Sequence, residues 1–187
     1  MRPRDPAVGE AILSAARELL AEVGYQRLTL DAVARRAGVS RPTLYLRWSS
    51  KAALVHDAVF GVDDPARALE QTGDLLADLS TLVRRSVALF GDPAVAAAVP
   101  GLLAEYRDHP DLRESLRDRV DRPVRAQFRA LVAGAVDQGQ IDVDVDADAL
   151  FDALVGAVVF RALVTGSSEG VAEPLLALAR RLLVVRT

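Results

Sequence analysis

Apolar residues recur with the period of an α-helix along nearly the whole of this 187-residue chain. No segment of five or more residues both alternates cleanly and is bounded by hairpin turn signals. We therefore expect an all-α protein. Proline and glycine divide the pattern into candidate helices at about 7–23, 29–38, 51–60, 65–90, 94–106, 111–138, 147–165 and 174–185, with a short helix after Gly38 and a kink or break at Pro123.

The segment after the first helix has the outline of a helix-turn-helix. Gly24 stands where a left-handed cap ends that helix, and Thr29 is placed to cap the next one, which ends at Gly38. Ser40 can cap a further short helix, and Pro42 is tolerated in its first turn. Two short helices joined by a turn containing glycine form a motif whose second helix enters the DNA major groove.

The residues from Leu28 to Tyr45, followed by Trp48 and Lys51, resemble the DNA-binding domain of TetR-family transcriptional regulators, and the resemblance spans about residues 10–56. It implies an N-terminal three-helix helix-turn-helix DNA-binding domain, residues 1–56, and a C-terminal helical ligand-binding and dimerisation domain, residues 57–187. We expect the boundary between the two near residues 56–64, where Gly61 and Pro65 mark a change of segment.

Side chains of the second short helix and its surroundings are the candidate DNA contacts. Arginine can donate two hydrogen bonds to guanine and threonine can bond a base edge, whereas a phenol, cations and hydroxyls can reach phosphate oxygens. The predicted set is Arg41, Pro42 and Thr43 for the bases, and Thr29, Ser40, Tyr45, Arg47 and Lys51 for the backbone. Thr29 and Ser40 could equally be caps alone, and Arg36 is a solvated residue or a phosphate contact. Family members often carry an aromatic or polar residue where Leu46 stands.

The charge is distributed in the way that this assignment requires. Residues 1–56 hold nine Arg or Lys against five Asp or Glu, a net charge of +4, and the remainder holds fourteen against twenty-one, a net of −7. A positive field at one end suits a polyanion. We assign Val33, Ala37, Val39, Leu44 and Trp48 to the core of this basic segment.

The composition offers little for catalysis. The chain has no cysteine and two histidines, His56 and His109, which we expect to be a surface or interdomain residue and a loop residue. We expect no metal, no cofactor and no enzymatic activity. The aspartates in 142–148 resemble a calcium loop in spacing but lack its glycine and closing glutamate, and Asp146 is better explained as a helix cap.

The last two candidate helices carry more apolar surface than packing on one side requires, which predicts a homodimer with a four-helix interface. The expected interface residues are Phe151, Leu154, Val155, Val158, Ala162, Leu175, Leu178, Ala179 and Leu182. A two-fold dimer would place two recognition helices about one DNA turn apart, matching a palindromic operator.

The family resemblance also implies a small effector that enters the second domain and releases the DNA. Candidate lining residues are apolar with one phenol, which suggests an apolar or amphipathic ligand: Phe90, Leu103, Tyr106, Phe128, Leu131 and Phe160. At helical spacing each could equally be core. Two alternatives stay open: a DNA-binding regulator whose second domain only dimerises or binds protein, and a helical enzyme that uses carboxylates.

The sequence contains no segment typical of export or membrane insertion. Its first ten residues lack the apolar region of a secretory signal, and the longest apolar stretch, 147–165, contains Asp148, Asp152 and Arg161. We expect a cytoplasmic protein with no membrane partner.

Overall fold

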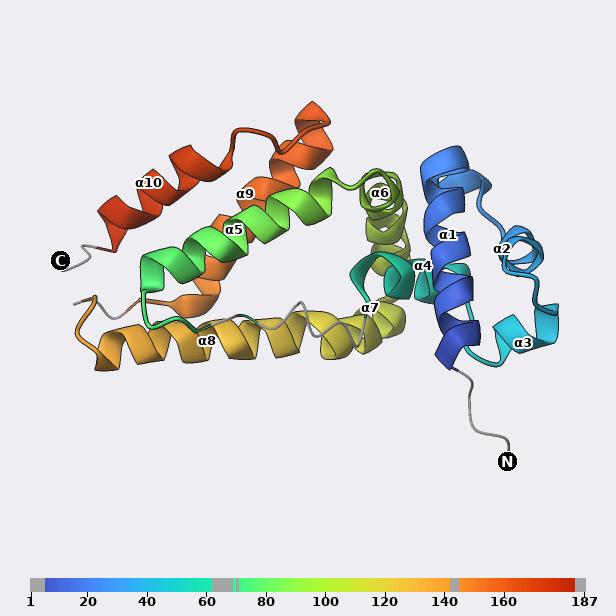
Figure 1. Cartoon of the computed structure of the whole chain (residues 1–187), viewed down its shortest axis with the longest axis horizontal. Coiled ribbons are helices and arrows are strands. Elements are labelled where there is room, and N and C mark those ends of the chain that lie inside the picture. The colour runs from blue at the N-terminus through green and yellow to red at the C-terminus, as the bar shows by residue number, and fades with distance from the viewer. Residues whose placement is uncertain (1–5, 62–68, 70, 142–144, 184–187) are drawn as a thin grey trace. The chain divides into compact units, whose positions relative to one another are not determined.

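The computed structural model describes residues 6–61, 69, 71–141 and 145–183, and every regular element in these ranges is helical (Figure 1), which confirms the all-α prediction. The helices are α1 (Pro6–Arg27), α2 (Leu30–Arg36), α3 (Arg41–Tyr45), α4 (Lys51–Phe60), α5 (Leu75–Gly91), α6 (Pro93–Asp108), α7 (Pro110–Leu116), the π-helical turn η2 (Arg117–Asp121), α8 (Arg122–Asp137), α9 (Ala147–Thr165) and α10 (Ala172–Leu182). None of these helices is by itself long and apolar enough to cross a bilayer. Only α5 and α6, counted as one segment, reach the required length and apolar composition.

The helices form two compact units. Unit 1 comprises residues 1–63 and 93–117, and unit 2 comprises residues 64–92 and 118–187. The chain therefore passes between the units three times, because α6 and α7 pack against α1 and α4 rather than with the helices that flank them in sequence. The division into a DNA-binding domain, residues 1–56, and a ligand-binding and dimerisation domain, residues 57–187, concerns function and stays a prediction.

In unit 1, α1 packs against α2, α4 and α6, and its apolar face supplies much of the core. The backbone of α1 breaks at Gly24, whose φ of 74° favours glycine, and one further turn then brings Tyr25 inward. Tyr25 lies against Gly101 of α6 so closely that a methyl group at Gly101 would overlap the phenol ring. The close approach of α1 and α6 thus depends on a glycine.

In unit 2, α5 packs against α8, α9 and α10, and α9 against α8 and α10. The rings of Phe128 and Phe151 meet edge to face with centroids 5.4 Å apart at the centre of this core. Gln140, just after α8, accepts a hydrogen bond from the first amide of α5 at 2.9 Å and donates one to the Gly73 carbonyl at 2.7 Å. These bonds tie the start of α5 to the end of α8, and the two helices run antiparallel.

Two predicted helices differ from those observed. The helix expected at 65–90 begins only at Leu75, because Gly73 adopts a φ of 86° and the Asp74 side chain caps the amide of Ala77; residues 65–68 and 70 lie outside the described ranges. The helix expected at 111–138 is divided by η2, which ends two residues before Pro123 in the first turn of α8, so the predicted break is confirmed. The helices predicted at 51–60 and 147–165 have the observed bounds.

Candidate DNA-binding surface

Two side-chain caps and a glycine turn shape the helix-turn-helix. Thr29 Oγ1 accepts a hydrogen bond from the amide of Ala32 at 3.2 Å, and Ser40 Oγ accepts one from the amide of Thr43 at 3.3 Å, so both predicted caps are confirmed as caps. Gly38 has a φ of 68° and reverses the chain between α2 and α3. The short helix α3 is thereby held in a defined direction despite its five residues.

The two faces of α3 differ sharply. Leu44 and Trp48 are buried behind the helix, as expected, with exposed fractions of 0% and 7%. Arg41, Pro42 and Tyr45 are exposed on the other side. The surface that α3 presents is therefore made of the side chains expected to meet DNA.

Arg41 is held by a partner that the sequence analysis did not identify. Its guanidinium forms an ion pair with Asp31 in the first turn of α2. Thr43 is also engaged, because its hydroxyl lies 2.8 Å from that of Ser40. Base recognition by Arg41 must therefore use the guanidinium donors that Asp31 leaves available.

The two cations that follow α3 lie against α1. A methyl group placed on Gly9 would be 2.7 Å from Arg47 Nη1, which shows how closely the guanidinium covers the helix backbone. Lys51 Nζ donates a hydrogen bond to the Tyr25 carbonyl at 3.1 Å and lies 4.2 Å from the centroid of the Tyr25 ring. Both residues therefore help to hold the helix-turn-helix to α1, and an ammonium retains further donors for a phosphate.

Arg36 joins α2 to α1. Its guanidinium bonds both oxygens of Glu22, at 2.9 and 2.8 Å, and one oxygen of Glu18 at 3.2 Å. The hydrogen bond from Arg36 lowers the pKa of Glu22. The two glutamates are four residues apart on α1 and therefore lie on one face of the helix, a spacing from which an arginine-binding site could have been predicted. These bonds make Arg36 a structural residue in the free protein.

Behind α3, unit 1 buries a polar cluster. The indole Nε1 of Trp48 donates a 2.8 Å hydrogen bond to Asp57, and His56 Nδ1 lies 3.5 Å from the same carboxylate. Of the two positions predicted for His56, surface or interdomain, the surface one is wrong: only 4% of it is exposed, because Phe60 and Tyr106 pack around its ring. Burial, followed by the Asp57 charge, raises the pKa of Tyr106, whose hydroxyl is buried with no hydrogen-bond partner among the described residues.

The residues predicted to line an effector site are distributed over both units. Phe128 and Leu131 are core residues of unit 2, with exposed fractions of 1% and 6%, whereas Phe160 is 63% exposed on α9. Phe90 is half-buried at the end of α5. Leu103, which is 49% exposed, and Tyr106 belong to α6 of unit 1.

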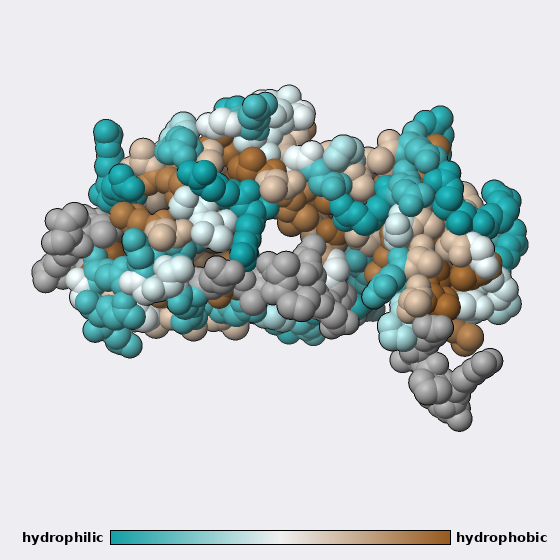
Figure 2. Space-filling model, viewed as in Figure 1, coloured by the Kyte–Doolittle hydropathy of each residue, from teal (hydrophilic) through white to brown (hydrophobic). Residues whose placement is uncertain are grey.

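The residues predicted for a dimer interface are also of two kinds. Phe151, Leu154, Val158 and Ala179 are each at most 8% exposed and belong to the core of their own unit, so the chain itself already covers them and their assignment to an interface is corrected. Of the others, Val155 and Leu175 are half-buried and pack against that core, and Ala162 is half-buried, whereas Leu178 and Leu182 on α10 are 52% and 66% exposed. Figure 2 shows hydrophobic residues at the surface around α10.

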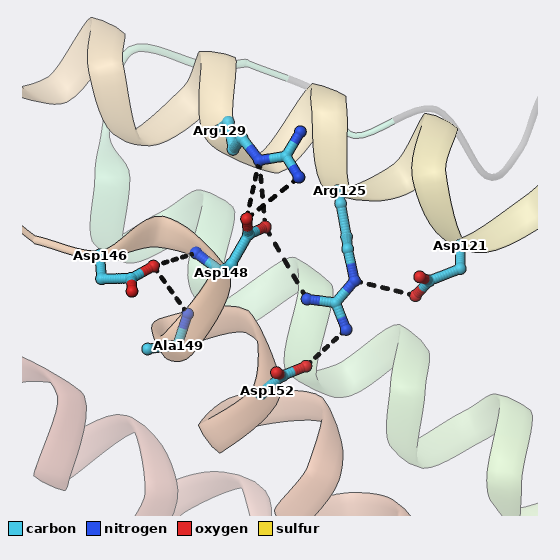
Figure 3. A network of polar contacts seen from close by, with 7 residues as sticks. All are labelled: Asp121, Arg125, Arg129, Asp146, Asp148, Ala149 and Asp152. Atoms are coloured by element: carbon cyan, nitrogen blue, oxygen red, sulfur yellow. Dashed lines mark hydrogen bonds and ion pairs between the residues drawn. The ribbon is translucent and has the colours of Figure 1, made fainter. Parts of the chain in front are cut away.

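An ion-pair network joins α8 to α9 (Figure 3). Arg125 contacts Asp121, Asp148 and Asp152 and lies over the Phe151 ring, with 4.7 Å between the guanidinium carbon and the ring centroid. Burial lowers the pKa of Arg125, but the two hydrogen-bonded aspartates, 152 and 121, raise it by more.

Asp146 caps the start of α9, as predicted, by accepting from the amides of Asp148 and Ala149. Residues 142–144 of the acidic run lie outside the described ranges. In the described part of the chain no group of three or more His, Cys, Asp or Glu side chains is arranged to hold a metal ion.

The fold and the exposed face of α3 define a helix-turn-helix DNA-binding protein, and two family models identify its class. Residues 12–58 match the bacterial regulatory proteins of the tetR family, and residues 69–179 match the tetracyclin repressor-like C-terminal domain. The chain belongs to the TetR family of transcriptional regulators. This family membership confirms that it is a regulator and not an enzyme, which removes the helical-enzyme alternative.

Similar proteins cover most of the chain. The HTH-type transcriptional regulator YdeS of Bacillus subtilis is 32% identical over 88% of this chain and 83% of its own length. The DNA-binding transcriptional repressor TetR of Mycobacteroides abscessus is 31% identical over 83% of this chain and 82% of its own. The crystal structure of the TetR family transcription regulator SCO0332 is 33% identical, with a TM-score of 0.74 over 95% of this chain and 97% of that one.

Proposed function

We propose that this protein binds a palindromic operator as a homodimer and represses transcription in the cytoplasm by occupying a promoter. The exposed face of α3 carries this proposal, because Arg41 and Tyr45 extend from it while Leu44 is buried behind them. A helix that presents polar side chains in this way fits the major groove of B-DNA. The Mycobacteroides abscessus relative is named a repressor, which supports repression rather than activation.

Each predicted contact has a distinct task. Arg41 reads guanine O6 and N7, Thr43 bonds a base edge or meets a methyl group, and Pro42 offers only shape and apolar contact. Phosphate oxygens accept hydrogen bonds from the residues that surround α3, namely Thr29, Ser40, Tyr45, Arg47 and Lys51.

We place the dimer interface on the outer sides of α9 and α10. Exposed apolar or small residues recur along α9 at helical spacing, at Ala153, Gly156 and Phe160, and the exposed Leu178 and Leu182 follow one another by one turn on α10. Glycine and alanine allow close approach of a second helix, and a contiguous apolar face of this kind requires cover. Replacing both leucines by glutamate should give monomers in sedimentation experiments that lose operator affinity, while Leu103→Glu on α6 should not.

The effector that we propose is small and mostly apolar or amphipathic. Its candidate contacts are the phenol of Tyr106 and the apolar residues of the predicted set, of which Phe90, Leu103 and Phe160 are not fully buried. The FadR regulator of Bacillus subtilis has the same fold, with a TM-score of 0.71 at 17% identity, and was crystallised with stearoyl-CoA. Release of DNA then requires that the ligand bind more tightly to the conformation that cannot engage the operator.

The first experiment is selection of random duplex DNA by the purified protein. An enriched palindrome supports a dimeric, sequence-specific regulator and supplies the operator. Failure of a folded dimer to enrich any sequence contradicts the proposal.

Variants of α3 then test the assigned contacts on that operator. Arg41→Ala should weaken specific binding by about 1 kcal/mol or more and relax preference at one guanine, whereas Lys51→Ala should weaken binding to all sequences alike. Because Arg41→Ala also leaves the Asp31 carboxylate near the DNA, the double variant Asp31→Ala/Arg41→Ala separates lost recognition from new repulsion. Arg107→Ala, at a 78% exposed arginine of α6, is the matched control and should bind as the wild type does.

Thermal unfolding in the presence of a compound library distinguishes this proposal from the alternative, a regulator that binds no effector. A specific ligand raises the midpoint by mass action and should lower operator affinity in the same concentration range. A library that shifts neither quantity favours a second domain used for dimerisation or protein contacts.

A further inference from the structure

One exposed side chain at the end of α3 has no role in the proposed DNA contacts. Leu46 is 80% exposed, the highest fraction of any large apolar side chain in the described part of the chain. Its backbone is still helical, with φ of −65° and ψ of −19°, and its amide bonds the Pro42 carbonyl at 3.0 Å. Leu46 therefore extends the recognition helix by one position.

Leu46 and Pro42 form an apolar strip on the exposed face. They are four residues apart, so they lie one above the other on the same side of the helix, next to the equally spaced pair Arg41 and Tyr45. Leu44 and Trp48 occupy the opposite, buried face. The strip thus lies beside Arg41 and Tyr45 on the exposed side of α3.

The chemistry of Leu46 restricts what it can meet in a DNA groove. A leucine can hydrogen-bond neither a phosphate oxygen nor a base edge, so any contact that it makes with DNA is apolar. The apolar group that base pairs present in the major groove is the C5-methyl of thymine. The surrounding segment carries a net charge of +4, which favours a polyanion as the occupant of this face.

We propose that Leu46, together with Pro42, is a specificity residue that reads thymine through its C5-methyl group, beside the guanine read by Arg41. This assignment rests on the proposed operator binding and extends it to a base that no hydrogen bond would select. Each half-site of the operator then contains a thymine at which the methyl group contributes to affinity.

The test removes that methyl group and nothing else. In the selected operator each thymine is replaced in turn by deoxyuridine, and affinities are measured for the wild type, Leu46→Ala and the control Val136→Ala, at a 44% exposed apolar residue of α8. At one position of the half-site, deoxyuridine should weaken wild-type and Val136→Ala binding about fourfold, the effect expected for one buried methyl group. Leu46→Ala should lose most of this difference and keep only the part that Pro42 contributes.

The outcomes separate this assignment from the proposed function. If an operator is enriched but no thymine methyl matters, or if Leu46→Ala retains the wild-type sensitivity, the assignment is wrong. If Leu46→Ala weakens binding to both duplexes by the same factor, the preference for thymine persists. That result indicates that Leu46 contacts the sugar backbone, and it also overturns the assignment. If no sequence is enriched, the proposed function and this assignment fail together. Unchanged unfolding midpoints are expected for Leu46→Ala, because its side chain is exposed.

Discussion

Substitution of Gly101 by alanine is the sharpest test of how α1 and α6 pack. The added Cβ would lie 2.8 Å from Cε1 of Tyr25 and nearer still to Cδ1 and Cγ. The ring has little room to move, since Tyr25 is 5% exposed and its hydroxyl donates to Glu105 Oε1 at 3.3 Å. Its carbonyl also accepts the hydrogen bond from Lys51.

Two opposing effects set the magnitude. Alanine in place of glycine inside a helix stabilises by about 0.5–1 kcal/mol. Overpacking costs about 1–3 kcal/mol, and overlap with three ring atoms, one of them adjacent to the Tyr25 Cβ, places the cost at the upper end. Gly101→Ala should therefore lower the free energy of unfolding by about 2 kcal/mol.

The assay is urea unfolding followed by circular dichroism, with Gly134→Ala as the matched control. Gly134 is also inside a helix, α8, but a Cβ there would meet nothing within 4 Å, so that variant should be slightly more stable than the wild type. In a Tyr25→Ala background Gly101→Ala should become stabilising as well. If Gly101→Ala behaves like Gly134→Ala in the wild-type background, the close approach of α1 and α6 is refuted.

Four further predictions use the same unfolding assay. Tyr106→Phe should stabilise by about 1 kcal/mol, because it removes a buried hydroxyl with no partner in the described residues, whereas Tyr25→Phe should destabilise. Burial raises the folded-state pKa of both phenols above the unfolded value of about 10, so stability should be full below pH 10 and fall above it, and each Phe variant should flatten that fall. Trp48→Phe should cost about 1–3 kcal/mol, because the Asp57 carboxylate loses its indole donor, and should weaken operator binding; unchanged stability would contradict a role for this bond. Arg125→Ala should cost about 1–2 kcal/mol through lost ion pairs and stem packing, and insensitivity to the change would show that the α8–α9 network is only a surface feature.

The elements with local signals were predictable from the sequence. Helix α9 has its predicted bounds because Asp146 caps its start and Gly166 ends it with a φ of 75°. The late start of α5 was also readable, since Gly73-Asp74 is a turn followed by a cap, but the apolar residues before it suggested a continuous helix. Local chemistry outweighed periodicity there.

Long-range packing could not be predicted in this way. Apolar residues lie all around helix α9, so periodicity alone does not separate Phe151, which faces the core, from Phe160, which does not. Likewise the burial of His56 depends on Tyr106, fifty residues later in the chain, and the Asp31–Arg41 pair depends on the angle between two short helices. These features arise from tertiary structure, and they account for most of what the sequence analysis missed at the candidate site.

The discontinuous composition of unit 1 has a consequence for protein engineering. A chimeric regulator built by transplanting residues 1–63 alone would leave behind α6 and α7, which cover α1 and α4, and would expose the surface against which Tyr25 and His56 now pack. The exchangeable cassette is therefore two pieces of sequence, with 93–117 grafted together with the N-terminal segment. Recombination between members of this family would have to respect the same pairing to yield hybrids that fold.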